Sequence, residues 1–178
     1  MGVIELNAET ILFFEGGYLK VLKEEDITEE YVSGLNNPKV NRYLEVRHSK
    51  QSYESVKYFI TQNLNSKNSI LFGIWGDQKK NFLGTVRIHG ISDKLSTSHI
   101  GICIFDELSW GFGFGKKSVM SVTSWALKIK KIKQVEAGVY IDNLASQKIF
   151  LSAGYKWKCN LIDKYPNSVI KVYVASAD

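Results

Sequence analysis

The chain contains few of the residues on which disulfide-stapled and metal-stapled proteins depend. Its 178 residues include two cysteines, Cys103 and Cys159, which stand far apart and form no C-x-x-C pair. Because neither a disulfide framework nor a zinc site can be inferred from this spacing, we expect two buried, reduced thiols and no bound metal. A chain of this length buries roughly 70% of the surface that its unfolded form exposes. We therefore expect one domain over residues 1–178, with one core.

Long apolar runs are also missing near the N-terminus. The longest uninterrupted one, residues 11–14, is far too short to span a bilayer, and the segment carries acids where a signal peptide has lysines. Gly2 does not open a myristoylation motif, because Leu6 stands where Ser or Thr is needed. We expect a cytoplasmic protein with no membrane partner.

Charge of one sign is not strongly in excess. Lys and Arg number 23 against 18 Asp and Glu, and the net charge of +5 suits an anionic ligand as well as a nucleic acid. The lysines of residues 128–133 are able to contact nucleic-acid phosphates. Lysines at a helix C-terminus also complement the helix dipole, and we favour this explanation. We expect no nucleic-acid partner.

Apolar periodicity predicts helices alternating with strands. Asp26 and Glu29 resemble a capping box that opens a helix ending before Pro38, residues 36–50 are expected to be irregular, and a second helix is expected over 51–64. A long helix follows residue 117, with an apolar stripe at Val119, Val122, Trp125, Ala126 and Ile129, and a short helix from about Asn143 to Ala153 ends at Gly154. Strands are expected over 18–22, 70–76, 82–91, 98–105, 134–140, 155–161 and 169–175.

These elements predict an α+β fold. We expect one mixed, mostly antiparallel sheet of about six or seven strands, flanked by about four helices. The three strands over 70–105 are expected to form a meander, and the strand–helix–strand order over 98–140 predicts a parallel pair. The last strand, 169–175, is rich in apolar residues and is expected to form a free edge at which a homodimer pairs.

The most informative segment is SWGFGFGKK, which joins a strand to the long helix. It places Gly111, Gly113 and Gly115 in the turn. Glycine permits positive φ, and the first helical turn offers unpaired N–H groups and the positive end of the helix dipole, so the segment is able to hold a phosphate. It is not a Walker A loop, because Trp110 replaces the first glycine, nor G-x-G-x-x-G, because Lys116 takes the last position. A purely structural turn explains the glycines equally well.

A second signal lies one strand further along the chain. Asn143 is a good N-cap, and this capping role is enough to explain an asparagine at the start of a helix. It opens an N-x-x-S pattern that ends at Ser146, followed by Ala-Gly-Tyr at residues 153–155. The combination with the glycine loop is far more restrictive than either segment alone. Over nearly the whole chain, and most clearly over residues 100–155, the sequence resembles the GCN5-related N-acetyltransferase (GNAT) family.

Within that family, the motifs of this chain resemble those of one branch. These motifs are an IGI strand, W-G-x-G-x-G, VEAGVY, and N-x-x-S followed by AGY. The segment NNPKVNRYL is similar to the N-x-P-x-V-x-x-Y-L segment of the branch that contains ribosomal-protein alanine acetyltransferases and polyamine acetyltransferases.

The resemblance implies acetyl-CoA as cosubstrate. Loop amides would accept the pyrophosphate, at Gly111, Phe112, Gly113, Phe114, Gly115 and Lys116. The strand over 100–104 would run beside the pantetheine arm, and an amide near Ile102, Cys103 or Ile104 would steady the thioester carbonyl. Asn143 and Ser146 would face the sulfur, with Ser146 as general acid. Two positions depart from the family pattern, because Phe150 replaces a common tyrosine acid and Phe112 a frequent basic residue.

The implied reaction is direct attack of a primary amine in a ternary complex, with no covalent enzyme intermediate. A base should lie near the amine, and the candidates are His89, His99, Asp106 and Glu107, of which we select His89 and Glu107. The family's acceptor pocket corresponds to residues 43–48, where Tyr43, Arg47 and His48 suit an anionic small molecule such as a nucleotide-linked amino sugar. Two alternatives remain, a protein N-terminus as acceptor and a coenzyme A-binding module without turnover.

Overall fold

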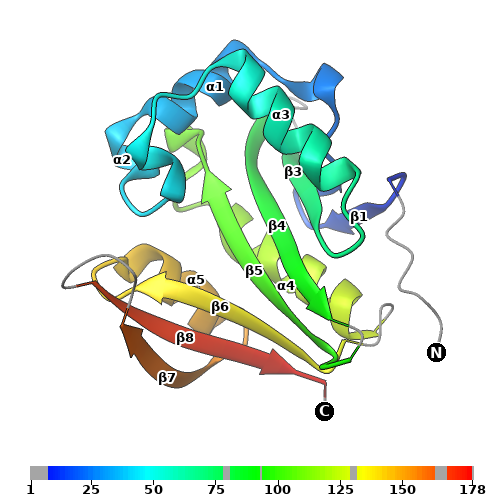
Figure 1. The fold of residues 1–178 in the computed structure, drawn as a ribbon, viewed down its shortest axis with the longest axis vertical. Coiled ribbons are helices and arrows are strands. Elements are labelled where there is room, and N and C mark those ends of the chain that lie inside the picture. The colour runs from blue at the N-terminus through cyan, green and yellow to red at the C-terminus, as the bar shows by residue number, and fades with distance from the viewer. Residues whose placement is uncertain (1–7, 78–80, 93, 129–131, 163–167, 178) are drawn as a thin grey trace.

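One sheet runs through the structure, and it carries helices on both faces (Figure 1). The computed structural model describes residues 8–77, 81–92, 94–128, 132–162 and 168–177. Within these residues, eight strands follow the order β1-β2-β3-β4-β5-β6-β8-β7. Their bounds are β1 (Ile11–Phe14), β2 (Gly17–Val21), β3 (Ile70–Gly76), β4 (Phe82–Ser92), β5 (Thr97–Ile104), β6 (Gln134–Tyr140), β7 (Lys156–Ile162) and β8 (Val169–Ser176).

The helices divide between the two faces of the sheet (Figure 1). Their bounds are α1 (Glu29–Asn36), α2 (Pro38–Asn41), α3 (Tyr53–Leu64), α4 (Phe114–Lys128) and α5 (Leu144–Ser152), with 3₁₀ turns at Glu24–Asp26, Glu45–His48 and Glu107–Ser109. Helices α1 to α3 cover one face, and α4 and α5 cover the other. None of the helices in the described ranges is both long and apolar enough to cross a bilayer.

Strand β3 contributes side chains to two hydrophobic cores, one on each face of the sheet. Its run ILFGIWG is buried throughout, and its side chains point alternately to the two faces. Phe72 packs edge-on against Trp125 of α4, with ring centroids 5.6 Å apart. Leu71 belongs to the opposite core with Val56 and Ile60 of α3. The central strands are therefore fixed from both sides, which makes them a rigid base for a site.

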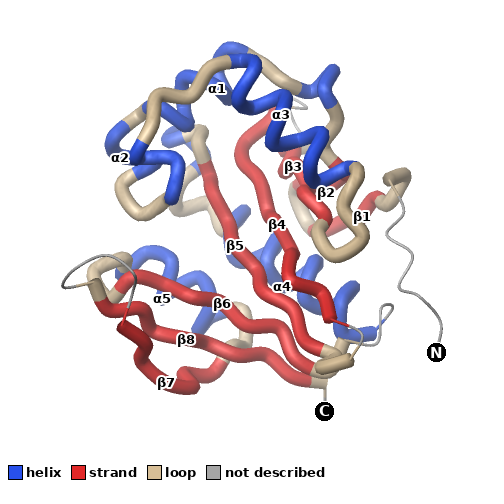
Figure 2. The backbone as a smooth tube through the Cα atoms, viewed as in Figure 1, coloured by secondary structure: helices blue, strands red, loops and turns tan. Residues whose placement is uncertain are grey.

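The neighbours β5 and β6 separate along their length (Figure 2). They are parallel and pair at Thr97–His99 with Gln134–Glu136, and no ladder pair joins their described residues beyond that point. Strand β5 continues to pair with β4, and β6 pairs with β8 along its whole length. The facing edges of β5 and β6 thus keep backbone N–H and C=O groups without a strand partner.

The α+β fold and the mixed, mostly antiparallel sheet are confirmed, because β5 and β6 form the parallel pair and the other described pairs are antiparallel. The strands over 70–76 and 134–140 have the predicted bounds. The apolar stripe of α4 is confirmed at Val119, Val122, Trp125 and Ala126, whereas Ile129 lies outside the described residues. So do Lys130 and Lys131 of the basic segment.

Strand β1 was not predicted, and the sheet has more strands than expected for that reason. Its four residues pair with β2 through a tight turn in which Gly16 has φ +89°. Two apolar runs separated by a glycine-containing turn are typical of a hairpin, so the sequence does carry this signal.

The first helix begins later than predicted. Thr28, not Asp26, is its N-cap, because the Thr28 hydroxyl accepts the Tyr31 amide at 3.1 Å. The Asp26 carboxylate instead accepts the Lys23 amide at 2.9 Å and pairs with Lys20 at 2.6 Å. The segment 36–50 is also more regular than expected, since it holds α2 and a 3₁₀ turn. Short helices of this kind lack the periodicity by which a sequence shows a helix.

Two further expectations are wrong. Strand β8 lies between β6 and β7, so it is not a free edge, and β7 is the outer strand on that side. The sequence did not predict this strand order, because β8 inserts between β6 and its sequence neighbour β7. Long-range packing, and not a local signal, decides that position. The expectation of two buried thiols fails at Cys159, which is half-buried, whereas the Cys103 thiol is buried enough to raise its pKa although that residue as a whole is also half-buried; both cysteines are free.

Candidate active site

The glycine loop has the predicted geometry at Gly111 and Gly113, whereas Gly115, also predicted in the turn, lies in the first turn of α4. Gly111 and Gly113 both have φ +84°, a region that side chains with a Cβ rarely adopt. The Trp110 indole donates to the carbonyl oxygen of Ile104 at 3.0 Å and so ties the loop to the end of β5. The first helical hydrogen bond of α4 runs from the Lys117 amide to the Gly113 carbonyl at 3.0 Å.

The start of α4 is free to bind an anion. None of the hydrogen bonds among the described residues uses the backbone amides of Phe114, Gly115 or Lys116. These groups are the orphan donors of a helix N-terminus, where the dipole also favours negative charge. The start of α4 therefore has the free N–H donors that a phosphate site would need.

Gly115 is the point at which three elements meet. A Cβ built there would lie 2.9 Å from Cδ1 of Ile149 on α5 and 3.6 Å from Cδ1 of Ile102 on β5. The glycine thus permits α4 to approach both elements closely. The structure brings together three predicted parts of the coenzyme site, the loop, the β5 segment and α5.

Helix α5 begins where Asn143 caps it. The Asn143 side-chain oxygen accepts the Ser146 amide at 3.1 Å, as the N-cap prediction requires. Ser146 lies three and four residues before Ile149 and Phe150, so the three side chains share the helix face that meets α4 and β5. Phe150 is buried, with its ring 5.1 Å from that of Tyr155.

Gln147 is a structural residue that sequence reasoning missed. Its amide nitrogen donates to the Ile141 carbonyl at 2.6 Å, and its oxygen accepts Lys171 and Tyr173 of β8, both at 3.1 Å. This buried side chain locks α5 onto β6 and β8. A lone glutamine inside a helix gives no sequence signal for such a role.

A cavity of about 340 Å³ lies on the face of β4 and β5 that α1 and α3 cover, opposite to α4 and α5. It is enclosed by these two strands, α1, α3 and the 3₁₀ turn at Glu45–His48. Its floor is set by strand register, which pairs His89 with His99, Arg87 with Gly101, and Thr85 with Cys103. Alternate residues share a face, so His89, Arg87, Thr85, Gly101 and Cys103 all line it. We call it the β4–β5 cavity. Of this set the sequence had singled out His89 and Cys103, and it had missed the others.

Electrostatics in the β4–β5 cavity favour neutral groups. Burial, assisted by the charge of Arg87 and by His99, lowers the pKa of His89 to about 4, so the imidazole is neutral at physiological pH. The rings of His89 and His99 lie 5.7 Å apart. Burial raises the pKa of the Cys103 thiol to about 12, which keeps it protonated and non-nucleophilic.

The predicted acceptor residues of the segment 43–48 lie beside the open end between β5 and β6. The Tyr43 hydroxyl donates to the Asp142 carbonyl at 3.1 Å, and the Arg47 guanidinium donates to the Tyr140 hydroxyl at 3.2 Å and to the Leu44 carbonyl at 2.9 Å. These bonds join the segment to the end of β6. His48 closes the 3₁₀ turn and is exposed, and Tyr43, Arg47 and His48 are not among the residues that line the β4–β5 cavity.

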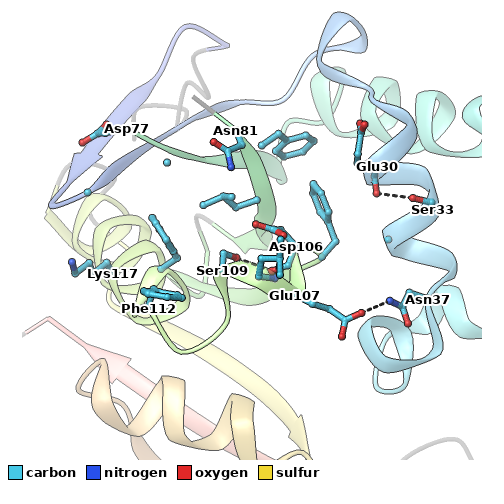
Figure 3. Close-up of a pocket in the computed structure, with 18 of the residues that line it drawn as sticks. Glu30, Ser33, Asn37, Asp77, Asn81, Asp106, Glu107, Ser109, Phe112 and Lys117 are labelled. Carbon is cyan, nitrogen blue, oxygen red and sulfur yellow. Dashed lines mark hydrogen bonds between the residues drawn. The ribbon is translucent and has the colours of Figure 1, made fainter. Parts of the chain in front are cut away.

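Glu107 lies in a different place. Its carboxylate accepts Asn37 at 2.6 Å and Lys39 at 3.2 Å, and these hydrogen bonds, with the Lys39 charge, lower its pKa. It faces a cavity of about 1290 Å³, which extends from α1 to Phe112 and Lys117 (Figure 3). The structure does not bring Glu107 together with His89.

That larger cavity does not suit a phosphorylated coenzyme. Five carboxylates line it, from Glu15, Glu30, Asp77, Asp106 and Glu107. Lys117, also at its wall, pairs with Glu15 at 3.1 Å and donates to the Glu15 carbonyl. Such a surface repels an anion. The coenzyme is therefore expected on the side of the loop that faces β5, β6 and α5, although the other cavity is larger.

Comparison with known proteins agrees with this geometry. The acetyltransferase (GNAT) domain profile matches residues 18–156. The uncharacterized N-acetyltransferase YoaA of Bacillus subtilis (strain 168) is 24% identical to the chain over 140 residues, which cover 78% of each protein.

Two solved structures share the fold at lower identity. Spermidine N-acetyltransferase from Vibrio cholerae, in complex with CoA and spermine, has a TM-score of 0.79 and 15% identity, over 92% of this chain and 96% of that one. Ribosomal-protein-S5-alanine acetyltransferase from Vibrio fischeri has a TM-score of 0.76 and 17% identity, over 95% and 97%. The residues matched by the domain profile include the glycine loop, the β5 segment and the start of α5. The chain therefore belongs to the GNAT acetyltransferase family and is an acetyl-CoA-dependent N-acetyltransferase.

Proposed function

We propose that this protein acetylates a primary amine of a small molecule by direct attack while amine and coenzyme are bound together. The observation that carries the proposal is the position of β5 between two half-sites. The Ile102 side chain reaches Gly115 at the start of α4, and Gly101, Ile102 and Cys103 of the same strand all line the β4–β5 cavity. A coenzyme on one side and an amine on the other would meet at the same strand.

The residues present fit acetyl-CoA. The free amides of Phe114, Gly115 and Lys116 suit its pyrophosphate, and Gly111 and Gly113 give the loop its shape. The unpaired edges of β5 and β6 are able to hydrogen bond an extended chain with amide groups, as pantetheine has. Acetyl-CoA supplies an acetyl thioester, and transfer replaces its C–S bond by a C–N bond while one proton leaves the nitrogen and one joins the sulfur.

The roles of the polar residues follow from their protonation. His89, neutral because its pKa is about 4, has a lone pair available to accept a hydrogen bond from the amine, and the same low pKa makes it a weak base, so the proton of the amine would pass to water. Ser146, on the face of α5 that meets α4, is proposed to protonate the departing thiolate. Cys103, held as a thiol, supports a direct reaction without an acyl-enzyme.

The acceptor we propose is small. A volume of about 340 Å³ suits the amino end of a small molecule, including the amino-sugar part of a nucleotide-linked sugar, whose remainder would lie outside near Arg47 and His48. Glu45 is the carboxylate among the cavity's described lining residues, which disfavours a polyamine. A protein N-terminus is the second candidate, because a ribosomal-protein alanine acetyltransferase shares the fold.

The first test is calorimetric titration with acetyl-CoA, with adenosine diphosphate and duplex DNA as controls. Micromolar binding, followed by release of free thiol when amines are added, is the expected result. The amine panel holds amino sugars, a nucleotide-linked amino sugar, N-terminal peptides and polyamines. Binding without thiol release from any amine would identify a coenzyme A-binding module, and absence of binding would refute the coenzyme site.

A further inference from the structure

Arg87 is held in a fixed orientation inside the β4–β5 cavity. Its Nε donates to Asn63 Oδ1 at 2.8 Å and to Ser69 Oγ at 3.1 Å. Asn63 and Ser69 are themselves buried and joined at 2.6 Å, and the Asn63 amide nitrogen donates to the Phe59 carbonyl. The guanidinium carbon lies 5.2 Å from the centre of the Phe59 ring. Three side chains therefore position one guanidinium.

The outer half of that guanidinium has no hydrogen-bond partner among the described residues. All the hydrogen bonds of Arg87 to described residues use Nε, and both Nη nitrogens are left over. No ion pair among the described residues includes Arg87. Burial lowers its pKa, so the cation is partly desolvated without a counter-anion. Two parallel Nη donors match the two oxygens of a carboxylate.

Space for such an anion exists directly across the strand. Gly101 is the ladder partner of Arg87, and a Cβ built on Gly101 meets nothing within 4 Å. The remaining walls are mostly apolar and include Leu44, Val56 and Leu71. With His89 neutral, Arg87 is the single cation among the lining residues, which matches a monovalent carboxylate better than a phosphate dianion.

We infer that the acceptor amine carries a carboxylate, bound by Arg87, and an apolar body, as a free amino acid with an apolar side chain does. The inference rests on the proposed acetyl transfer and names, in place of the amino sugar considered above, a free amino acid as its substrate class. Glu45 at the rim adds a negative charge that favours entry of the ammonium end of such a zwitterion. The size and apolar walls of the cavity suit leucine, methionine or phenylalanine.

The test compares amines that differ in the carboxylate alone. Release of free thiol from acetyl-CoA is measured with leucine, methionine and phenylalanine, and each amino acid is compared with its amide. O-Phosphoethanolamine is a further acceptor, which tests whether the site prefers a phosphate to a carboxylate. An amide lowers the pKa of the neighbouring amine, so without recognition of the carboxylate the amides would react faster. We expect at least one amino acid to have a kcat/KM roughly 10- to 100-fold above that of its amide, the range for a charge-assisted hydrogen bond.

Variants of Arg87 connect this preference to the residue. Arg87→Gln should abolish the preference and Arg87→Lys should keep part of it, while acetyl-CoA affinity stays unchanged in both. Amides that react as well as their acids, a preference that survives Arg87→Gln, or faster reaction of O-phosphoethanolamine would each overturn the inference. If no amine releases thiol, the proposed function fails separately. Calorimetry then compares the binding of leucine and leucinamide to the CoA-saturated protein. Tighter binding of leucine would support recognition of the carboxylate by Arg87, and equal binding would overturn it.

Discussion

The substitution Gly113→Val should remove coenzyme binding without unfolding the chain. Gly113 has φ +84°, and the atom nearest to an added Cβ is Cε of Lys117 at 4.0 Å, so the cost is backbone strain and not a clash. Strain of this kind costs about 1–3 kcal/mol. For a domain of this size the melting temperature would fall by about 2–12 °C.

The loss of affinity should be much larger than that loss of stability. Valine relieves its strain by moving the loop, and the movement displaces the free amides of Phe114, Gly115 and Lys116 from the phosphates. Each charge-assisted hydrogen bond contributes about 1.5–3 kcal/mol, so losing two weakens acetyl-CoA binding by roughly 10²- to 10⁴-fold.

Gly154→Val is the matched control. Gly154 has φ +90° with nothing within 4 Å of an added Cβ, and it follows the C-terminal end of α5. Calorimetry with acetyl-CoA and thermal melts of both variants should show similar destabilisation, with a loss of affinity in Gly113→Val alone. Unchanged affinity in Gly113→Val, or an equal loss in Gly154→Val, would refute the assignment of the phosphate-binding loop.

Three further outcomes are expected. Ser146→Ala should lower kcat by about 10²-fold with little change in acetyl-CoA affinity, because a general acid acts in the transition state; steady-state kinetics and calorimetry measure the two. A Cβ on residue 101 meets nothing within 4 Å, so Gly101→Val should occupy part of the β4–β5 cavity and raise the acceptor KM by more than about tenfold with little change in melting temperature. His89 is neutral in the folded protein down to pH about 4 but takes up a proton below about 6.5 when unfolded, so its contribution to stability is complete above pH 6.5 and is lost as the pH falls toward 4. Urea titrations of wild type and His89→Gln at both ends of this window should show a steeper fall for the wild type.

Each of these outcomes has a result that contradicts it. Normal turnover in Ser146→Ala would remove the acid role and leave proton transfer to water. An unaltered acceptor KM in Gly101→Val would show that the amine binds outside the β4–β5 cavity. Parallel pH dependence of stability in wild type and His89→Gln would show that the histidine titrates normally in the folded protein.

The sequence by itself determined the elements that depend on local signals. The strand over 70–76, the helix after the glycine loop and the N-cap at Asn143 follow from apolar periodicity, from positive-φ glycines and from a side chain that caps its own helix. Each is decided within about a dozen residues, so the sequence carries it directly. The positive φ of Gly111 and Gly113 was predictable for the same reason, because one segment contains both glycines and the helix start that follows them.

Tertiary structure alone decided which of these segments meet. Strand register places Arg87 opposite Gly101 and orients it by Asn63 and Ser69, none of which has a local signal for binding. Strand order puts β8 inside the sheet and not at its edge. Glu107 and His89 are only 18 positions apart, yet they face different cavities. Register and strand order are chosen by burial summed over residues distant in the chain, and no short segment encodes that sum.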